Sequence, residues 1–170
     1  RIKLIIDPGM AFGTGQHSTT FMCLELIEKY AADHKNGSML DVGTGTGVLA
    51  IAASKLEFIN VTAVDTDPLA VEASQTNAEC NGISGIDIRH GDIKAVNDRY
   101  DLITANILSG ILIEIAQNIS ERLNENGIAI MSGILVGQED GVITAMQKAG
   151  LTFKEKMVND KWVALVFHRG

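Results

Sequence analysis

Residues 41–47, which read Asp-Val-Gly-Thr-Gly-Thr-Gly, constrain the fold of this chain more than any other segment. An apolar run at 38–42 leads into them, and a helix-like run at 48–56 follows. Glycines at a strand–loop–helix turn permit backbone angles that other residues avoid, and they let a ligand lie against bare backbone. A second apolar run, 61–64, ends in Asp65 and so places a carboxylate at the tip of the neighbouring strand. The pattern indicates an α/β fold with a nucleoside-cofactor site.

Strand-like and helix-like segments alternate through the rest of the chain. This alternation favours a Rossmann-like parallel sheet with helices on both faces, closed by an antiparallel hairpin. We expect helices at 18–30, 48–56, 68–81, 109–123 and 138–149, and strands at 38–42, 61–64, 86–90, 100–105, 128–131, 151–159 and 162–168.

A glycine and three polar residues mark the ends of four of the predicted strands. Gly43, Asp65, Asp92 and Asn106 each come at the carboxyl end of a strand. In open α/β sheets, ligands bind at these carboxyl ends. We therefore expect the four residues to lie around one site.

The glycine spacing distinguishes between two classes of cofactor. A dinucleotide-binding loop reads G-x-G-x-x-G and holds a pyrophosphate, whereas here the third glycine comes one residue early and Asp41 precedes the loop. A carboxylate at the mouth opposes a pyrophosphate and suits a ligand that carries an ammonium or sulfonium group. S-adenosylmethionine carries both, with a ribose for Asp65 and an adenine amino group for Asp92. A nicotinamide cofactor is the alternative ligand. The two acids also have alternative structural roles: Asp41 can cap a turn, and Asp92 can be a solvent-exposed residue of a loop.

Composition limits the function classes. The chain has 170 residues, 46% of them hydrophobic, and a formal net charge of −7. The negative charge argues against direct nucleic-acid binding and is compatible with a basic protein partner. The sequence shows no signal peptide and no membrane-spanning run, which predicts a cytoplasmic protein that does not bind membranes. We expect Cys23 and Cys80 to be buried free thiols, and the histidines show no metal-ligand spacing, so no metal site is expected.

Two further segments carry a family resemblance. Residues 7–20 read D-P-G-M-A-F-G-T-G-Q-H-S-T-T, and residues 106–110 read N-I-L-S-G. Together with the glycine loop, they resemble the ribosomal protein L11 methyltransferase family, PrmA, over nearly the whole chain. The resemblance implies a seven-stranded class I methyltransferase fold that uses S-adenosylmethionine. It also implies methylation of lysine and N-terminal amino groups on a large-subunit ribosomal protein.

The resemblance also implies a domain organisation. Residues 1–170 are expected to form a single methyltransferase catalytic domain, with an N-terminal lid loop and helix at 1–37 and a Rossmann-like core at 38–170. Members of the family usually carry an N-terminal domain that grips the ribosomal protein, and this sequence begins about where that domain would end.

Site residues follow from the resemblance and the strand ends together. The family positions that contact the cofactor match Thr20, Gly43, Asp65 and Asn106 of this chain. The resemblance also implies that Phe12 forms part of the wall around the cofactor. The residues expected to contact the cofactor are Phe12, Thr20, Asp41, Gly43, Gly45, Asp65, Asp92 and Asn106.

Asn106 is also the expected catalytic residue. Its side-chain carbonyl can accept a hydrogen bond from the incoming amine and aim the lone pair, and the amine must arrive neutral. The aromatic clamp of the related N-P-P-[YF] motif is missing here.

Other functions remain open from the sequence. The fold does not fix the methyl acceptor, so RNA or a small amine is an alternative to a protein. A nicotinamide-dependent oxidoreductase and a non-catalytic module that binds S-adenosylmethionine are further alternatives.

Overall fold

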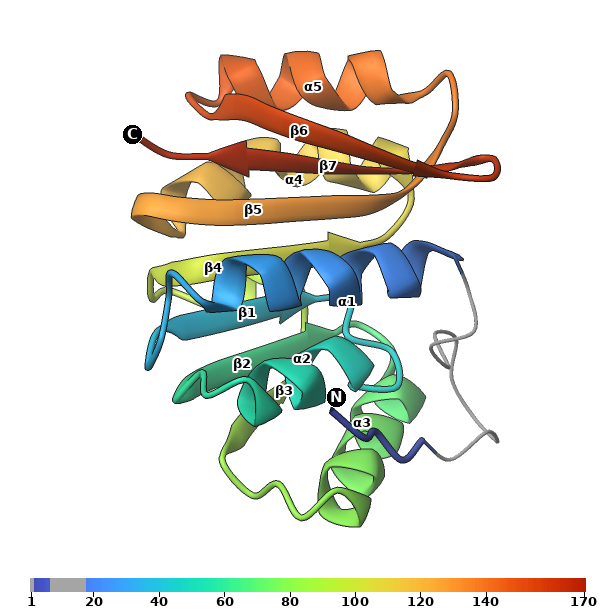
Figure 1. Ribbon diagram of the computed structural model, residues 1–170, viewed down its shortest axis with the longest axis vertical. Coiled ribbons are helices and arrows are strands. Elements are labelled where there is room, and N and C mark those ends of the chain that lie inside the picture. Colours follow the sequence, from blue (N-terminus) through green and yellow to red (C-terminus); the bar gives the residue numbers. More distant parts are fainter. Residues whose placement is uncertain (1, 7–17) are drawn as a thin grey trace.

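Seven strands form a single sheet in the computed structural model, which describes residues 2–6 and 18–170 (Figure 1). The strand order is β3-β2-β1-β4-β5-β7-β6. Strands β1 to β5 pair in parallel, whereas β7 runs antiparallel to both of its neighbours, β5 and β6. This architecture confirms the predicted seven-stranded, mostly parallel sheet with a C-terminal hairpin.

The element bounds follow the predicted alternation closely. The strands are β1 (Ser38–Val42), β2 (Asn60–Asp65), β3 (Ile86–His90), β4 (Tyr100–Asn106), β5 (Leu123–Leu135), β6 (Thr152–Asn159) and β7 (Trp162–His168). The helices are α1 (Ser18–Ala31), α2 (Val48–Lys55), α3 (Pro68–Cys80), α4 (Ser109–Glu121) and α5 (Glu139–Lys148), with a short 3-10 turn, η1 (Ile93–Ala95).

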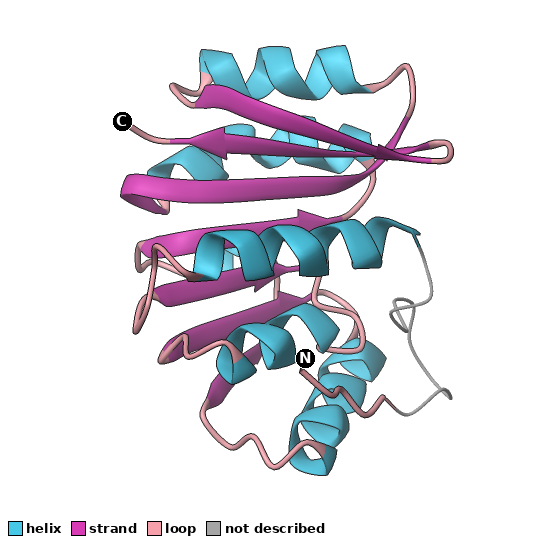
Figure 2. Cartoon of the chain, in the orientation of Figure 1, coloured by secondary structure: helices cyan, strands magenta, loops and turns pink. Residues whose placement is uncertain are grey.

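Helices cover both faces of the sheet (Figure 2). Along each central strand, successive side chains point to opposite faces, because the strand repeat is two residues. Met39 of β1 and Leu102 of β4 pack with α1 and α2, whereas the next residues, Leu40 and Ile103, pack with α4 and α5. The near-continuous apolar runs in the sequence are therefore explained by a sheet that is buried on both sides.

One strand differs from its sequence prediction. The strand predicted at 128–131 begins earlier, at Leu123, so that Asn126 and Gly127, a pair typical of turns, lie inside β5. Asn126 keeps the positive φ of 62° that suits a turn, and its amide donates to the carbonyl of Arg169 at 2.8 Å. Pairing with the chain terminus and with β4 therefore overrides the local turn signal.

The helix predicted at 109–123 ends early, at Glu121. Leu123 fits the helical spacing of apolar residues, but it pairs with Tyr100 at the start of β5 instead. The Arg122 guanidinium donates to the carbonyls of Val96 and Asn118. These contacts favour a chain reversal at Arg122 over a further helical turn.

The two cysteines differ in burial. Cys23 on α1 is a buried free thiol, as expected, but Cys80 is exposed. The prediction of two buried thiols is therefore wrong for Cys80, which lies at the last position of α3.

The N-terminal residues 2–6 lie against the α2–α3 side of the molecule. Leu4 and Ile6 pack on the core, and the Asn81 amide group both accepts from the Ile5 amide at 2.9 Å and donates to the Ile5 carbonyl at 2.7 Å. Residues 7–17 lie outside the described residues. The division into a lid region at 1–37 and a core at 38–170 therefore stays a prediction.

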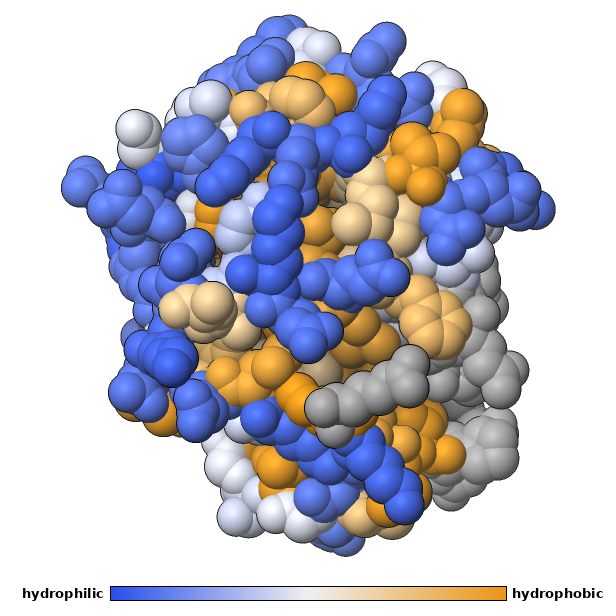
Figure 3. Space-filling model, in the orientation of Figure 1, coloured by the Kyte–Doolittle hydropathy of each residue, from blue (hydrophilic) through white to orange (hydrophobic). Residues whose placement is uncertain are grey.

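Polar and apolar side chains alternate over the face that carries α1 and α2 (Figure 3). Large apolar side chains exposed elsewhere include Leu108 and Ile111 at the start of α4. None of the helices in the described ranges is long and apolar enough to span a bilayer.

The two tyrosines offer a matched test of the fold. The Tyr100 hydroxyl donates to Thr62 Oγ1 at 2.9 Å across the buried sheet, whereas within residues 2–6 and 18–170 the Tyr30 hydroxyl has no hydrogen-bond partner. We expect Tyr100→Phe to lower the free energy of unfolding by about 1–2 kcal/mol, because Thr62 loses its buried partner. Tyr30→Phe should change it by less than about 0.5 kcal/mol. Urea unfolding of both variants measures this difference, and equal losses would contradict it.

Candidate functional site

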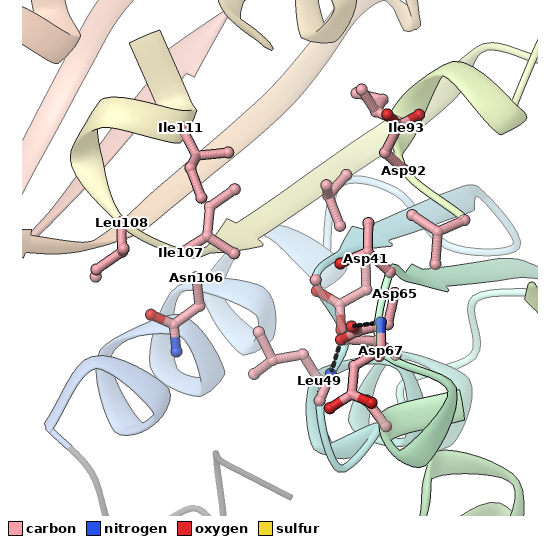
Figure 4. Close-up of a pocket in the computed structure, with 18 of the residues that line it drawn as sticks. Asp41, Leu49, Asp65, Asp67, Asp92, Ile93, Asn106, Ile107, Leu108 and Ile111 are labelled. Atoms are coloured by element: carbon pink, nitrogen blue, oxygen red, sulfur yellow. Dashed lines mark hydrogen bonds between the residues drawn. The ribbon is translucent and has the colours of Figure 1, made fainter. Parts of the chain in front are cut away.

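A cavity of about 650 Å³ opens where the parallel strands end (Figure 4). Seven of the eight residues expected to contact a cofactor line it: Thr20, Asp41, Gly43, Gly45, Asp65, Asp92 and Asn106. The eighth, Phe12, lies outside the described residues. The predicted meeting of strand ends is therefore confirmed as a matter of geometry, while the role of each residue stays a prediction.

The glycine loop wraps over the end of β2. The amides of Gly43 and Thr44 both donate to the Val64 carbonyl, at 2.9 and 3.0 Å. Gly43 and Gly45 adopt positive φ angles of 71° and 58°, a region in which other residues are strained. The loop thus presents bare backbone to the cavity, as the sequence pattern indicates.

Asp65 ties the glycine loop to the end of β2. One carboxylate oxygen accepts from the Gly45 amide at 2.9 Å, and the other accepts from the Asp67 amide at 2.9 Å. A carboxylate has about four lone-pair positions, so each oxygen can accept a further hydrogen bond. Asp65 is only half-buried and faces the cavity, where a ligand hydroxyl can reach it.

Asp41 is buried beneath the loop rather than exposed at the mouth. Its two oxygens accept from the hydroxyls of Thr44 and Thr104, each at 2.7 Å. Burial raises the pKa of Asp41 to about 6, and the nearby Asp65 carboxylate adds to that rise, while the two hydroxyl bonds oppose it. The prediction of Asp41 as a carboxylate at the mouth is therefore wrong in its placement, because both of its oxygens accept from hydroxyls inside the protein, while its contact with a cofactor stays a prediction.

Asn106 ends β4 at the opposite side of the cavity from the acids. Its amide nitrogen faces the hydroxyl of Thr20 on α1 across a long contact of 3.5 Å. Thr20 is buried in the first turn of α1, so its position is well fixed. This contact leaves the carbonyl oxygen of Asn106 as the atom available to an incoming donor.

Asp92 follows β3 and lines the cavity from an exposed position. One of its carboxylate oxygens accepts from the Lys94 amide at 2.8 Å and thereby caps η1. The exposed loop position expected as the alternative for Asp92 is therefore present, the capping of η1 was not predicted, and a contact with an adenine amino group stays a prediction.

The cavity has an acidic end and an apolar end. Asp41, Asp65, Asp67 and Asp92 gather on one side, whereas Asn106 is accompanied on the other by the apolar group Ile107, Leu108 and Ile111 (Figure 4). These three apolar residues were not predicted as part of the site, although their position within five residues after Asn106 is the signal that could have indicated them.

The charged side chains that line the described part of the cavity wall are all acidic. Among the described residues that line it, none is Lys, Arg or His. In the same described ranges, no group of three or more His, Cys, Asp or Glu side chains is arranged to hold a metal ion. The cavity therefore suits a ligand with positive charge better than one with a pyrophosphate.

The buried Asp41 carboxylate predicts a dependence of stability on pH. Its pKa is raised from 3.8 to about 6, so the native state binds the proton more tightly than the unfolded state does. The contribution of Asp41 to the free energy of unfolding therefore falls as the pH rises from about 4 to about 6. We expect Asp41→Asn to remove this fall. The stability of the variant relative to the wild type should rise by about 2–3 kcal/mol between pH 4 and pH 7.

Urea unfolding at several pH values measures this difference. The exposed Asp98→Asn variant is the control and should show no such trend. A constant difference between Asp41→Asn and the wild type would contradict the raised pKa.

Comparison with known proteins agrees with this geometry. The family model described as "Ribosomal protein L11 methyltransferase (PrmA)" matches residues 1–170. A ribosomal protein L11 methyltransferase from Myxococcus xanthus is 40% identical over 168 residues, which cover 99% of this chain and 58% of the relative. One from Heliobacterium modesticaldum is 41% identical over 170 residues, which cover 99% of this chain and 53% of the relative. The chain thus spans about half the length of these curated relatives.

A solved structure supports the same assignment. The ribosomal protein L11 methylase from Lactobacillus delbrueckii subsp. bulgaricus superimposes with a TM-score of 0.89 at 36% identity. The match covers 96% of this chain and 83% of that one. The chain therefore belongs to the ribosomal protein L11 methyltransferase (PrmA) family.

Proposed function

We propose that this chain binds S-adenosylmethionine and transfers its methyl group to amino groups of ribosomal protein L11. The observation that carries the proposal is the cavity at the strand ends, with carboxylates at one end and Asn106 at the other. Family membership supports the reaction class. Because the chain spans about half the length of its relatives, its own activity and its acceptor are proposals.

The residues at the acidic end fit S-adenosylmethionine. The half-buried carboxylate of Asp65 can accept hydrogen bonds from both ribose hydroxyls, and the exposed carboxylate of Asp92 can accept one from an adenine amino group. The bare backbone of Gly43 and Gly45 lets the ligand approach closely. The absence of Lys, Arg and His from the described wall disfavours a dinucleotide, whose pyrophosphate needs compensation.

The apolar end fits the acceptor amine. When the cofactor is bound, its sulfonium supplies the electrophilic methyl group. An amine can attack only as the neutral base, and transfer to an apolar surface disfavours the ammonium form. Ile107, Leu108 and Ile111 provide such a surface beside Asn106. The Asn106 carbonyl oxygen then accepts from the amine and orients its lone pair, while Thr20 holds the amide.

The same wall argues against RNA as the acceptor. Single-stranded nucleic acids are bound by basic grooves with aromatic side chains on which bases stack. Trp162 is the one aromatic residue among the described residues that line the cavity, and none of them is basic. An aliphatic side chain ending in an amine matches this surface better than a nucleobase does.

The direct test is methyl transfer from radiolabelled S-adenosylmethionine. The chain is incubated separately with ribosomal protein L11, with ribosomal RNA and with free lysine. We expect label on L11 alone, at lysine or N-terminal amines located by mass spectrometry. Label on RNA or on free lysine would show that L11 is not the acceptor. Cofactor binding without transfer to any acceptor would show that the chain is a binding module.

Asp65 tests the cofactor assignment. Asp65→Ala should weaken S-adenosylmethionine binding by roughly 30-fold, about 2 kcal/mol, because charge-assisted contacts to the ribose and to the Gly45 amide are lost. Isothermal titration calorimetry measures the change, with NAD as a ligand that should not bind. Asp87→Ala is the control, since Asp87 lies in β3 outside the cavity. An unchanged affinity for Asp65→Ala would exclude the ribose contact.

Asn106 tests the acceptor assignment. Asn106→Ala should lower kcat on the order of 100-fold, because the amine loses the group that aims it, while cofactor affinity changes less than about threefold. Single-turnover methylation and calorimetry separate the two effects. The exposed Asn97→Ala variant should match the wild type in both. Equal losses of rate and affinity for Asn106→Ala would make Asn106 a binding residue only.

A further inference from the structure

A bulge interrupts β5 where it passes the end of β4. Met131 pairs with Leu165 of β7 and Ile134 pairs with Val163, so β5 carries one extra residue between these pairs. The extra residue falls at Ser132–Gly133, and Gly133 has a φ of 84°. Bulges with a glycine in the left-handed region occur next to active sites, where they redirect neighbouring groups.

The residue after Asn106 lies directly against this bulge. Asn106 is in register with Ser132, and the Ile107 amide donates to the Ser132 carbonyl at 3.1 Å. A Cβ atom at Gly133 would lie 2.9 and 3.0 Å from the carbonyl carbon and nitrogen of Ile107, and closer still to its carbonyl oxygen. All three atoms are backbone, so no side-chain rotation can relieve the contact.

The same residue is held from its other side by the cofactor loop. A Cβ atom at Gly43 would lie 2.6 Å from the Ile107 Cγ2 atom. Ile107 is thus enclosed between Gly43 and Gly133, with its side chain against one glycine and its backbone against the other. Both glycines line the cavity, as Ile107 does.

We propose that Gly133 is a positioning residue for methyl transfer: its missing side chain lets the Ile107 backbone pass against β5, and this passage sets where Asn106 presents its carbonyl oxygen. The inference rests on the proposed role of Asn106 in aiming the acceptor amine. An added Cβ at Gly133 displaces Ile107, and with it the adjoining Asn106, away from β5. A displacement of about 1 Å at such a group lowers rates by up to 100-fold.

Gly133→Ala is the test variant, and Gly150→Ala is its matched control. Gly150 has a similar φ of 95°, but a Cβ atom there meets nothing within 4 Å. Both variants therefore carry the backbone strain of a positive φ, and only Gly133→Ala moves Ile107. We expect Gly133→Ala to lower kcat roughly 30- to 100-fold, with less than about a threefold change in the Kd of S-adenosylmethionine, and Gly150→Ala to leave both unchanged.

A double-mutant cycle separates positioning from a general structural effect. In the Asn106→Ala background, Gly133→Ala should cause no further loss of kcat, because the group that it displaces is already gone. The proposal would be overturned if the kcat losses of the two single variants multiply in the double variant. It would also be overturned by a similar loss of cofactor affinity in Gly133→Ala, or by an equal loss of kcat in Gly150→Ala. If Gly133→Ala does not fold, Ile107→Ala loosens the same segment from the Gly43 side and is judged by the same cycle.

An NMR readout keeps this inference distinct from the proposed function. The side-chain amide signal of Asn106 is assigned by its absence from the Asn106→Ala spectrum. It should shift in Gly133→Ala and stay in place in Gly150→Ala, whether or not methyl transfer is observed. An unshifted signal would overturn the positioning role of Gly133. A wild-type kcat in Asn106→Ala would instead refute the proposed function of Asn106.

Discussion

The buried carboxylate of Asp41 joins the two halves of the site. Asp41 is in register with Thr104 on the neighbouring strand, and its oxygens accept from Thr104 on β4 and from Thr44 in the glycine loop. An ionised group that is removed from water requires such partners, so loop and strand are held together around it. Thr104 stands two residues before Asn106. The end of the cavity suited to the cofactor is thereby fixed relative to the end suited to the acceptor.

The carboxylates of the cavity lie apart from Asn106, and this separation suits the opposite electrostatic needs of a cationic cofactor and an acceptor amine. A cofactor with ammonium and sulfonium groups is favoured by nearby carboxylates, but the same carboxylates would stabilise the ammonium form of an acceptor amine. The carboxylates of Asp65 and Asp92 lie at the far end of the cavity, and the apolar group Ile107, Leu108 and Ile111 lies on the side of Asn106 (Figure 4). The polarity of the wall is therefore compatible with binding a cation and deprotonating an amine in one cavity.

Local signals in the sequence predicted most of the fold. The predicted start of α3 at Pro68 is one example: Asp67 caps the helix by accepting from the Leu69 amide, and both residue types are typical of helix starts. Strand ends also predicted which residues meet. The sequence failed where non-local pairing decides, as in β5, whose Asn126 has turn geometry within a strand. The prediction also placed Asp41 at the mouth of the site, because Thr104, one of the two threonines that donate to its carboxylate, reaches it only through the pairing of β1 with β4.

The contacts on the apolar side of the site are the hardest to predict from the sequence. A glycine such as Gly133 has the same local signature whether it ends a strand or makes room for another segment. Its contact with Ile107 depends on the register of β4 against β5, which no local pattern specifies. Ile107 also contacts the loop at Gly43, so one side chain and its backbone join three neighbouring strands. A change in the glycine loop and a change in β5 therefore act on the same residue, and their effects on the position of Asn106 should be coupled rather than additive.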